Sequence, residues 1–407
     1  MAAETNRSGG ADGYWSWAYA LLCICNLLIF FSFQMLLPTL PVYVIARGGD
    51  ASSVGLVVAV VTLAAVAIRP FAGYALDRGN RRFVVVAGSI AFAAAAGAFP
   101  VSSAPGWTIV CAALLGVGWG TLTAAYATLV SGLIPEGRQG AGIGTFMLFG
   151  MFSMAVGPFF GGWVYGAYGD RALFGAAFLV ALLSLLLFPA VRIGGRKAGT
   201  VSGGSATSNA GGARFVERSA IFPAFLILLF TIGYGGVLSF ASLFGQSLGV
   251  ANGGMFFLIA SIASMTVRPA AGKLFDAKGP ATVLLPGIAI GVASLAWLSA
   301  AATPWMYFAA SALFGLSFGA VQPYMLAWTV RRARPERQGA ANGTFLIGFD
   351  AGIALGSITL GLWSGTLGIA GTFRASAAAL TLMLIVYAVS VAAEKRARTR
   401  PVAEGRQ

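Results

Sequence analysis

The sequence predicts an all-α polytopic membrane protein of twelve transmembrane helices, arranged as two six-helix repeats. Three observations carry this prediction: the composition, a series of long apolar runs, and an internal repeat with a constant offset. Of the 407 residues, 58% are hydrophobic and 9% are charged, and the mean hydropathy is +0.84. A soluble domain carries roughly 25% charged residues, so most of this chain cannot face water.

Apolar runs long enough to cross a bilayer recur from Trp15 almost to the C-terminus. A hydrocarbon core of about 30 Å requires about 20 residues of helix. The first run is one of a series, so it is interpreted as a span and not as a cleaved signal peptide. The predicted spans lie near 15–37, 53–75, 83–102, 107–131, 139–166, 172–191, 220–246, 251–275, 281–301, 304–330, 338–366 and 371–393.

A Gly/Ser-rich basic stretch separates the sixth span from the seventh and has little apolar surface to bury, which is typical of a flexible linker. The predicted organisation follows from this stretch. It comprises an N-terminal six-helix half over 1–191, a cytoplasmic linker over 192–218, a C-terminal six-helix half over 219–393 and a cytoplasmic tail over 394–407.

The net charge of +14 is explained by membrane orientation. Of the 26 Lys and Arg residues, 21 lie in the termini, the linker and the other loops of one side, whereas the opposite loops hold Arg47, Arg171 and Arg374. Positively charged short loops stay in the cytoplasm, so both termini are predicted to be cytoplasmic. The basic residues form short segments between apolar runs, so no nucleic-acid partner is expected.

Cysteine and histidine usage argues against catalysis and metal binding. Cys23, Cys25 and Cys111 all fall inside apolar runs, where a disulfide or metal framework is not expected. Histidine is absent, which removes imidazole triads, histidine-bound zinc and imidazole proton relays. No Walker motif is present, so ATP is not the expected energy source. The sequence therefore predicts no metal, no cofactor and no enzymatic activity.

An internal repeat relates the two halves. The segment RPFAGYALD at 69–77 recurs as RPAAGKLFD at 268–276, with an offset of 199 residues. Two parallel six-helix halves with a site at their midplane interface are a transporter architecture. The same offset aligns Gly116 and Gly120 with Gly315 and Gly319, Arg138, Gln139, Gly140 and Ala141 with Arg337, Gln338, Gly339 and Ala340, and Gly144, Thr145 and Phe146 with Gly343, Thr344 and Phe345.

The segment GYALDRGNRR at 73–82 is similar to the signature loop of the major facilitator superfamily, G-x-L-x-D-R-x-G-R-R. Ala75 replaces the usual Leu, and the second Gly lies one place early at Gly79. The resemblance covers essentially the whole chain and implies a conformational latch, in which Asp77 meets a helix N-terminus or an arginine such as Arg138. An alternative is that the loop arginines only set the topology. The implied gating residues are Gly73, Asp77, Arg78, Arg81, Arg82, Arg138, Gly272, Asp276 and Arg337.

The fifth predicted span, GTFMLFGMFSMAVGPFFGG at 144–162, resembles the antiporter motif of the same family. The matching residues are Gly144, Gly157, Pro158, Gly161 and Gly162, while Ser153 replaces the middle Gly. Glycines give a smooth helix face and Pro158 favours a bend, so this helix is expected to pack tightly and seal a leak path. Ordinary helix packing is the alternative explanation. The family's arginine motif is missing from AALLGVGWG at 112–120.

Asp350 is the predicted proton-coupling residue. It lies thirteen residues beyond Arg337, near the bilayer midplane at about 1.5 Å per residue. A carboxylate there costs several kcal/mol unless it is paired, hydrated or protonated, so a proton could load and leave near neutral pH. A hydrogen-bonded structural role is the alternative. The repeat partner of Asp350 is Met151, and Arg69 and Arg268 are placed near the basic ends of the second and eighth spans.

Polar side chains concentrate on the four spans that line the central cavity in the family fold. Because these residues carry few charges, the cavity is expected to suit an amphipathic or neutral organic molecule. Each residue could instead make an interhelical hydrogen bond. The expected cavity residues are Asn26, Gln34, Trp119, Thr123, Tyr126, Tyr234, Gln246, Gln322 and Tyr324.

The predicted function is proton-coupled export of a small organic compound or drug by alternating access, with the substrate, protons and the lipid bilayer as partners. The alternatives are a proton symporter or facilitator for uptake of a sugar or organic acid and, less favoured, a membrane-embedded enzyme or a receptor without transport activity. The resemblance implies a monomer in the bacterial inner membrane.

Overall fold

The computed structural model describes residues 15–78, 81–102, 104–135, 138–191 and 217–399, and within these ranges the chain forms helices and no strands. The first half contains α1 (Trp17–Leu36), α2 (Leu40–Ala46), α3 (Ala51–Asp77), α4 (Arg81–Ala98), α5 (Pro105–Leu133) and α6 (Gln139–Leu187). The second half contains α7 (Arg218–Ser247), α8 (Met255–Lys278), α9 (Ala281–Ser299), α10 (Pro304–Arg332) and α11 (Gln338–Thr399). Short 3₁₀ turns occupy Phe99–Val101, Phe188–Ala190 and Pro335–Arg337.

Two of these helices are each long enough to cross the membrane twice. α6 has 49 residues and α11 has 62, or about 74 and 93 Å at 1.5 Å per residue. Each is interrupted by a glycine with positive φ, Gly169 (φ 80°) and Gly368 (φ 68°), a conformation that side-chain-bearing residues rarely adopt. The two glycines are separated by the repeat offset. With α6 and α11 divided there, the ten long apolar helices of the described chain give twelve spans, which confirms the predicted fold class.

Capping residues fix where several helices begin. The Ser16 hydroxyl accepts a hydrogen bond from the Tyr19 amide at 3.1 Å and starts α1. Asp50 starts α3 by accepting from the Ser53 amide at 2.9 Å. Hydrogen bonds from the hydroxyls of Ser53 and Ser52 and from the Ser53 amide lower the pKa of Asp50 to about 2. The cap therefore stays ionised at neutral pH, which favours a helix N-terminus.

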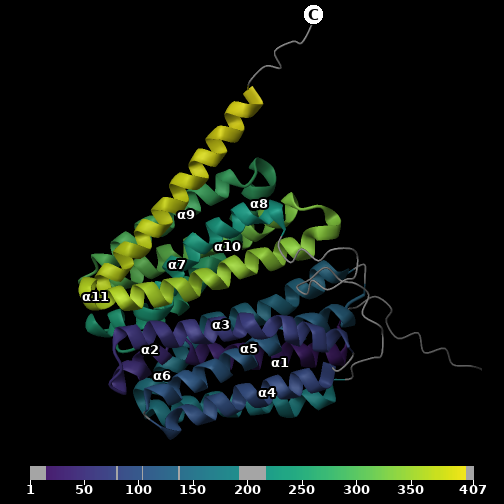
Figure 1. The fold of residues 1–407 in the computed structure, drawn as a ribbon, viewed down its shortest axis with the longest axis vertical. Coiled ribbons are helices and arrows are strands. Elements are labelled where there is room, and N and C mark those ends of the chain that lie inside the picture. Colours follow the sequence, from purple (N-terminus) through teal and green to yellow (C-terminus); the bar gives the residue numbers. More distant parts are fainter. Residues whose placement is uncertain (1–14, 79–80, 103, 136–137, 192–216, 400–407) are drawn as a thin grey trace, which may run out of the picture.

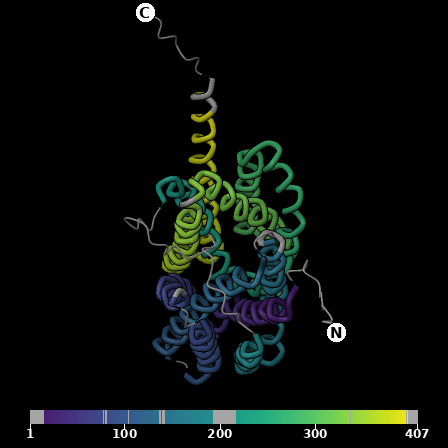
Figure 2. Tube along the Cα trace, turned by 90° about the vertical axis from the view of Figure 1, so that its right-hand side faces the viewer, coloured from purple at the N-terminus to yellow at the C-terminus, as the bar shows by residue number. Residues whose placement is uncertain are grey.

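The helices gather in two clusters. In Figure 1, α1 to α6 form the lower cluster and α7 to α11 the upper one, and Figure 2 keeps this separation after a 90° turn. Across the junction, α3 packs along α11 and α6 packs against α8. These are the two largest helix contacts between the halves, and the repeat offset relates them to each other; smaller contacts join α7 to α2 and α3.

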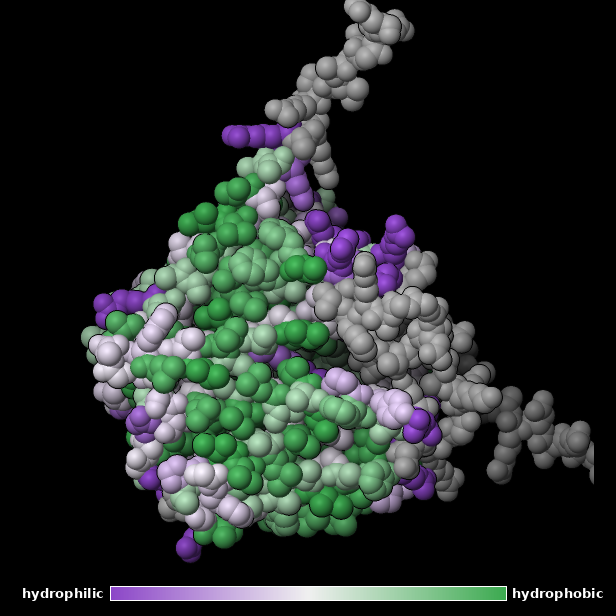
Figure 3. Space-filling view, in the orientation of Figure 1, coloured by the Kyte–Doolittle hydropathy of each residue, from purple (hydrophilic) through white to green (hydrophobic). Residues whose placement is uncertain are grey.

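The surface matches a lipid environment. Figure 3 shows broad hydrophobic areas over both clusters, with the hydrophilic colours mostly toward the edges. Large apolar side chains such as Phe71, Leu186 and Val389 are more than 60% exposed. A soluble protein rarely exposes so much contiguous apolar surface, so this surface is the one that faces the bilayer.

The predicted linker and tail fall largely outside the described residues. Of the linker, Glu217 and Arg218 are described, and they begin α7. Of the predicted tail, the residues up to Thr399 continue α11 as helix. The division of the chain at 192–218 stays a prediction.

Candidate functional site

The two ends of the bundle differ in charge and are named here for it. The arginine-poor end carries the connections around residues 37–50, 248–254 and 366–370, and the arginine-rich end carries the end of α3, the start of α4 and the connection around 332–338. At the arginine-poor end, Arg47 binds Asp170, the residue that follows the Gly169 break. This pair joins the connection after α2 to the turn inside α6, so it ties two connections of the same half together.

The halves are in close contact at the arginine-poor end. The Asn252 amide donates a hydrogen bond to the Phe159 carbonyl at 3.0 Å, and the Ser242 hydroxyl donates to the Pro38 carbonyl at 3.0 Å. A Cβ atom added to Gly254, the N-cap residue of α8, would lie 2.0 Å from the Pro158 carbonyl oxygen. The two backbones approach so closely that glycine is required there. The described conformation is therefore closed at this end.

The glycines predicted as an antiporter motif line two contacts of α6. A Cβ at Gly157 would lie 2.6 Å from the Gln34 Cβ, and one at Gly161 would lie 2.3 Å from the Met35 carbonyl oxygen, so both glycines face α1. Gly162 instead faces Asn252 of the other half. Gly144 has no atom near its Cβ position. The motif thus contributes to both close packing within the first half and contact between the halves.

Replacing Gly161 with valine is expected to destabilise the protein by about 1–3 kcal/mol, because the side chain would overlap the backbone of α1. The matched control is Gly166→Val on the same helix, where nothing lies within 4 Å of the Cβ position. Thermal unfolding of the purified variants in detergent measures the difference. Equal stability of the two variants would contradict the close contact between α6 and α1.

Asp350 of α11 binds Arg69 of α3 across the junction of the halves. The Asp350 side chain is 13% exposed and that of Arg69 is 32% exposed. Packing explains this orientation. Gly348, Gly352 and Gly356 recur every four residues and lie against α7. Asp350 lies about 200° around the helix from Gly348, so it points away from α7 and toward α3.

Arg69 faces the same junction because of its place on α3. A Cβ at Gly55 would lie 2.0 Å from the Ser357 carbonyl oxygen, so this face of α3 lies against α11. Arg69 is fourteen residues further on, which brings it within about 40° of the same face at 3.6 residues per turn. The ion pair therefore lies on the contact line between α3 and α11, eight residues before the end of α3 and twelve residues after the start of α11.

Arg268 of α8 makes the equivalent contact with Met151 of α6. Its Nη1 lies 3.0 Å from the Met151 sulfur. Arg268 is the repeat counterpart of Arg69, and Met151 is the repeat counterpart of Asp350. The thioether is only a weak hydrogen-bond acceptor, and the buried Nε of Arg268 has no hydrogen-bond partner. The two junctions therefore pair residues at repeat-related positions, and only the first of these pairs contains a carboxylate.

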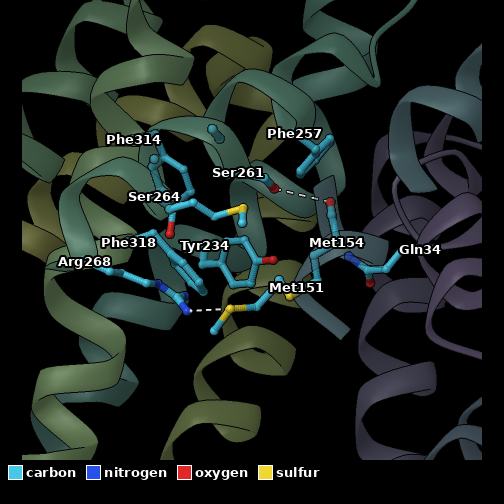
Figure 4. Close-up of a pocket in the computed structure, with 13 residues that line it drawn as sticks. Gln34, Met151, Met154, Tyr234, Phe257, Ser261, Ser264, Arg268, Phe314 and Phe318 are labelled. Carbon is cyan, nitrogen blue, oxygen red and sulfur yellow. Dashed lines mark hydrogen bonds between the residues drawn. The ribbon is translucent and has the colours of Figure 1, made fainter. Parts of the chain in front are cut away.

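A pocket lies between the halves beside Arg268 (Figure 4). Its cavity volume is about 50 Å³, and open space adjoins it. Gln34 of α1 lies on one side and Tyr234 of α7 points into the centre, with Arg268 and Met151 joined beneath it (Figure 4). The full lining is Gln34, Met151, Met154, Tyr234, Phe257, Ala260, Ser261, Ser264, Met265, Arg268, Phe314, Gly315 and Phe318.

Two of the expected cavity residues, Gln34 and Tyr234, line this pocket. Tyr324 instead packs inside the second half, where its hydroxyl donates to the Arg268 carbonyl at 2.5 Å and so holds α8 beside α10. Gln246 is exposed at the end of α7, and Gln322 is partly buried on α10.

The other expected cavity residues lie in the first half. Asn26 is buried on α1, and the Tyr126 hydroxyl lies 3.2 Å from that of Ser184 on α6. Trp119 stacks on Phe33 with ring centroids 3.9 Å apart. The Thr123 hydroxyl donates within its own helix, to Trp119.

The predicted gating residues of the second half make contacts within that half. Asp276 accepts a hydrogen bond from Arg331 at 2.7 Å, and a Cβ at Gly272 would lie 3.1 Å from the Tyr324 hydroxyl. Arg337 binds Glu217, the residue that caps α7. Burial raises the pKa of Glu217, but Arg337 and the Ser219 amide and hydroxyl outweigh burial and leave that pKa below its ordinary value.

The structure describes fewer contacts for the predicted gating residues of the first half. Arg78 lies over the Tyr74 ring at 4.3 Å, and Arg82 and Arg138 are exposed. Gly73 is buried in α3 and Arg81 begins α4. The Asp77 side chain lies outside the described residues, so its contact with Arg138 stays a prediction.

Sequence reasoning missed the two interior arginines. Both were placed near helix ends, where a long basic side chain usually reaches water. The structure shows that Arg69 and Arg268 also face the junction of the halves. The signal was available in the repeat, because the offset that relates Arg69 to Arg268 also relates Met151 to Asp350. The pocket methionines and phenylalanines gave no such signal, since they resemble ordinary apolar helix residues.

Comparison with known proteins decides the family. A sequence profile of the Major Facilitator Superfamily matches residues 22–357. The chain belongs to this superfamily. It is a membrane transporter and not an enzyme, as the sequence predicts. The resemblance inferred from the 73–82 loop is thereby confirmed.

Relatives of this superfamily member include multidrug resistance proteins of bacteria. Multidrug resistance protein MdtG of Enterobacter lignolyticus is 27% identical over 333 residues, covering 76% of each chain. MdtG of Citrobacter koseri is 26% identical over 328 residues, covering 76% of this chain and 78% of its own.

Solved structures show the same superfamily fold. The nucleoside transporter NupG matches with a TM-score of 0.74 at 13% identity and covers 92% of this chain and 99% of its own. An auto-inhibited peptide transporter of the POT family matches with a TM-score of 0.75 at 11% identity and covers 96% of this chain and 98% of its own. At these identities the likeness concerns the fold alone.

Proposed function

We propose that this transporter exports small organic compounds in exchange for protons, by alternating access around the pocket between its halves. The observation that carries the proposal is Asp350, a largely buried carboxylate that joins the two halves through Arg69. It is the only acidic residue inside a predicted span, and an intramembrane carboxylate is costly unless it has a functional or structural partner.

Protonation of Asp350 links the proton to the conformation. The ionised carboxylate holds α3 against α11, whereas the neutral acid loses the charge attraction to Arg69 and keeps at most an ordinary hydrogen bond. A proton therefore weakens the contact between α3 and α11, the larger of the two main helix contacts that join the halves. A conformational equilibrium responds to a ligand only through such a difference in interaction free energy.

The direction of export and the substrate class draw on two further observations. The MdtG relatives carry the name multidrug resistance protein. The pocket presents methionine and aromatic side chains, and flexible, polarisable methionines adapt to ligands of different shapes. Both features favour varied organic compounds over one small polar metabolite.

The orientation follows from the charge distribution. Both termini and the arginine-rich end face the cytoplasm of a bacterial inner membrane, because positively charged connections remain inside. The described conformation is then closed toward the outside. The chain acts as a monomer, since one copy contains both halves and the pocket between them.

Flux measurements in proteoliposomes test this function. The purified protein is reconstituted, a pH gradient is imposed, and the movement of lipophilic dyes, drugs, sugars and organic acids is followed, with protein-free vesicles as the control. Movement of a compound against the proton flow, lost when an ionophore collapses the gradient, supports exchange. Movement with the protons would identify a symporter, and movement indifferent to the gradient a facilitator; either result would overturn the proposal.

A further inference from the structure

We infer that Arg268 is the recognition group for an anionic substrate, so that the pocket takes amphipathic organic anions with a carboxylate, sulfonate or similar group beside an aromatic body. The inference rests on the proposed transport function and names its substrate class. The sequence alone predicts a neutral or amphipathic substrate in a cavity with few charges, whereas Arg268 favours a substrate with an anionic group.

The two repeat-related arginines differ in whether a counter-charge accompanies them. Arg69 is neutralised by Asp350, whereas Arg268, at the repeat-related position, faces the uncharged Met151. A guanidinium within the membrane interior is costly unless a counter-charge or water accompanies it. In the first junction the protein supplies the counter-charge. In the second, a ligand can supply it.

The Arg268 guanidinium has hydrogen-bond donors that the protein does not use. A guanidinium has five N–H donors in a fixed planar fork that matches a carboxylate. Its Nη1 contacts only the weakly accepting sulfur of Met151, and its Nε has no partner. The thirteen residues that line the pocket include no carboxylate. Strong acceptors on a bound anion would therefore improve on every contact that this side chain now makes.

The rest of the pocket beside Arg268 is lined mainly by aromatic and apolar side chains. Tyr234 lies beside Arg268 (Figure 4), and its ring packs on those of Phe318 and Phe314 at centroid distances of 5.0 and 6.0 Å. These rings, with Met154, form an apolar surface next to a single cation. A ligand with one anionic group and an aromatic body satisfies both parts, whereas an organic cation would meet Arg268 with repulsion.

The backbone of α8 at Arg268 is held in place by contacts with α10. The Tyr324 hydroxyl binds the Arg268 carbonyl, and the close contacts of Gly315 and Gly319 with Ala260 and Ser264 hold α8 against α10. The backbone that carries the guanidinium is therefore fixed before a ligand arrives. Such preorganisation lowers the entropic cost of binding.

Equilibrium binding to the purified protein in detergent tests the inference, with two probes of the same shape: naphthalene-2-carboxylate and naphthalene-2-carboxamide. Isothermal titration calorimetry at neutral pH is expected to show the carboxylate binding about ten- to hundredfold more tightly, the usual range for a charged hydrogen bond. Arg268→Met should abolish this preference. The matched control is Arg374→Met, which removes an exposed arginine outside the pocket and should keep the preference.

A second variant guards against a folding artefact. Met151→Asp would give Arg268 the internal carboxylate that Arg69 already has, so it is also expected to abolish the preference for the anion. Arg268→Met removes an uncompensated cation, so its thermal stability in detergent should equal or exceed that of the parent protein. Equal affinity for the two probes in the parent protein, no binding of the carboxylate, or a preference that survives Arg268→Met would overturn the inference.

This binding experiment requires no gradient, so its outcome is separate from that of the flux measurements. An arginine-dependent preference without proton-driven export would reject the proposed direction of transport and retain the anion site. Proton-driven export of neutral and cationic compounds, with no preference for the carboxylate probe, would retain the proposed function and reject the anion site.

Discussion

Asp350→Asn is expected to abolish proton-driven transport while the protein still folds. Asparagine keeps the shape of the side chain but carries no charge and cannot load a proton, so the contact between α3 and α11 no longer responds to pH. The measurement is gradient-driven flux in proteoliposomes, with binding of the same compound as the control for an intact pocket. Flux that keeps its full dependence on the pH gradient would show that Asp350 has a structural role only.

Stability measurements separate the two roles of this ion pair. Removing one member of a buried pair leaves the other uncompensated, so Asp350→Asn is expected to lower the free energy of unfolding by about 3 kcal/mol. The double variant Arg69→Met/Asp350→Asn leaves no isolated charge and should recover most of that loss. A non-additive cycle of this kind demonstrates direct coupling between the two side chains. Additive losses would mean that they do not interact.

Gly254→Ala is expected to keep the arginine-poor end from closing. The backbone of Gly254 has ordinary helical angles (φ −65°, ψ −18°), so alanine causes no local strain. Its Cβ would nevertheless lie 2.0 Å from the Pro158 carbonyl oxygen of the other half. Overpacking costs about 1–3 kcal/mol, and each 1.4 kcal/mol shifts an equilibrium about tenfold. The population should therefore move by about ten- to hundredfold toward conformations open at this end.

Spin-label distances measure this shift. Tyr168 and Leu367 are exposed residues beside the repeat-related breaks of α6 and α11, so cysteines at these positions report the separation of the halves. The three native cysteines are buried and react poorly. Gly254→Ala should lengthen the distance and reduce transport, whereas Gly166→Ala, with no neighbour within 4 Å, should change neither. An unchanged distance distribution would contradict the contact between Gly254 and Pro158.

The sequence predicted those features that depend on local chemistry and on the repeat. Span lengths follow from hydropathy, and the breaks at Gly169 and Gly368 fall between the spans that the sequence predicts. The interior position of Asp350 follows from counting residues along a helix. Each of these features can be predicted from the spacing of residues along the chain alone.

What the sequence could not supply was the direction in which each side chain points around its helix. α3, α5 and α6 are apolar on nearly all sides, since both lipid and neighbouring helices accept apolar residues. Hydropathy therefore cannot distinguish a junction face from a lipid face. For this reason the sequence does not pair Arg69 with Asp350. It also does not separate Tyr126 and Trp119, which pack inside the first half, from Tyr234, which reaches the pocket.

The methionine opposite Arg268 has a consequence for energetics. Because the second junction lacks its own carboxylate, a monoanion exported by the proposed exchange would leave with one negative charge while a proton on Asp350 would move inward. Each cycle would then move two positive charges into the cell. A membrane potential contributes about 2.3 kcal/mol per charge per 100 mV, so such a cycle is electrogenic and the voltage would drive export even without a pH difference. Had residue 151 been an aspartate like its repeat partner, this second charge would not move.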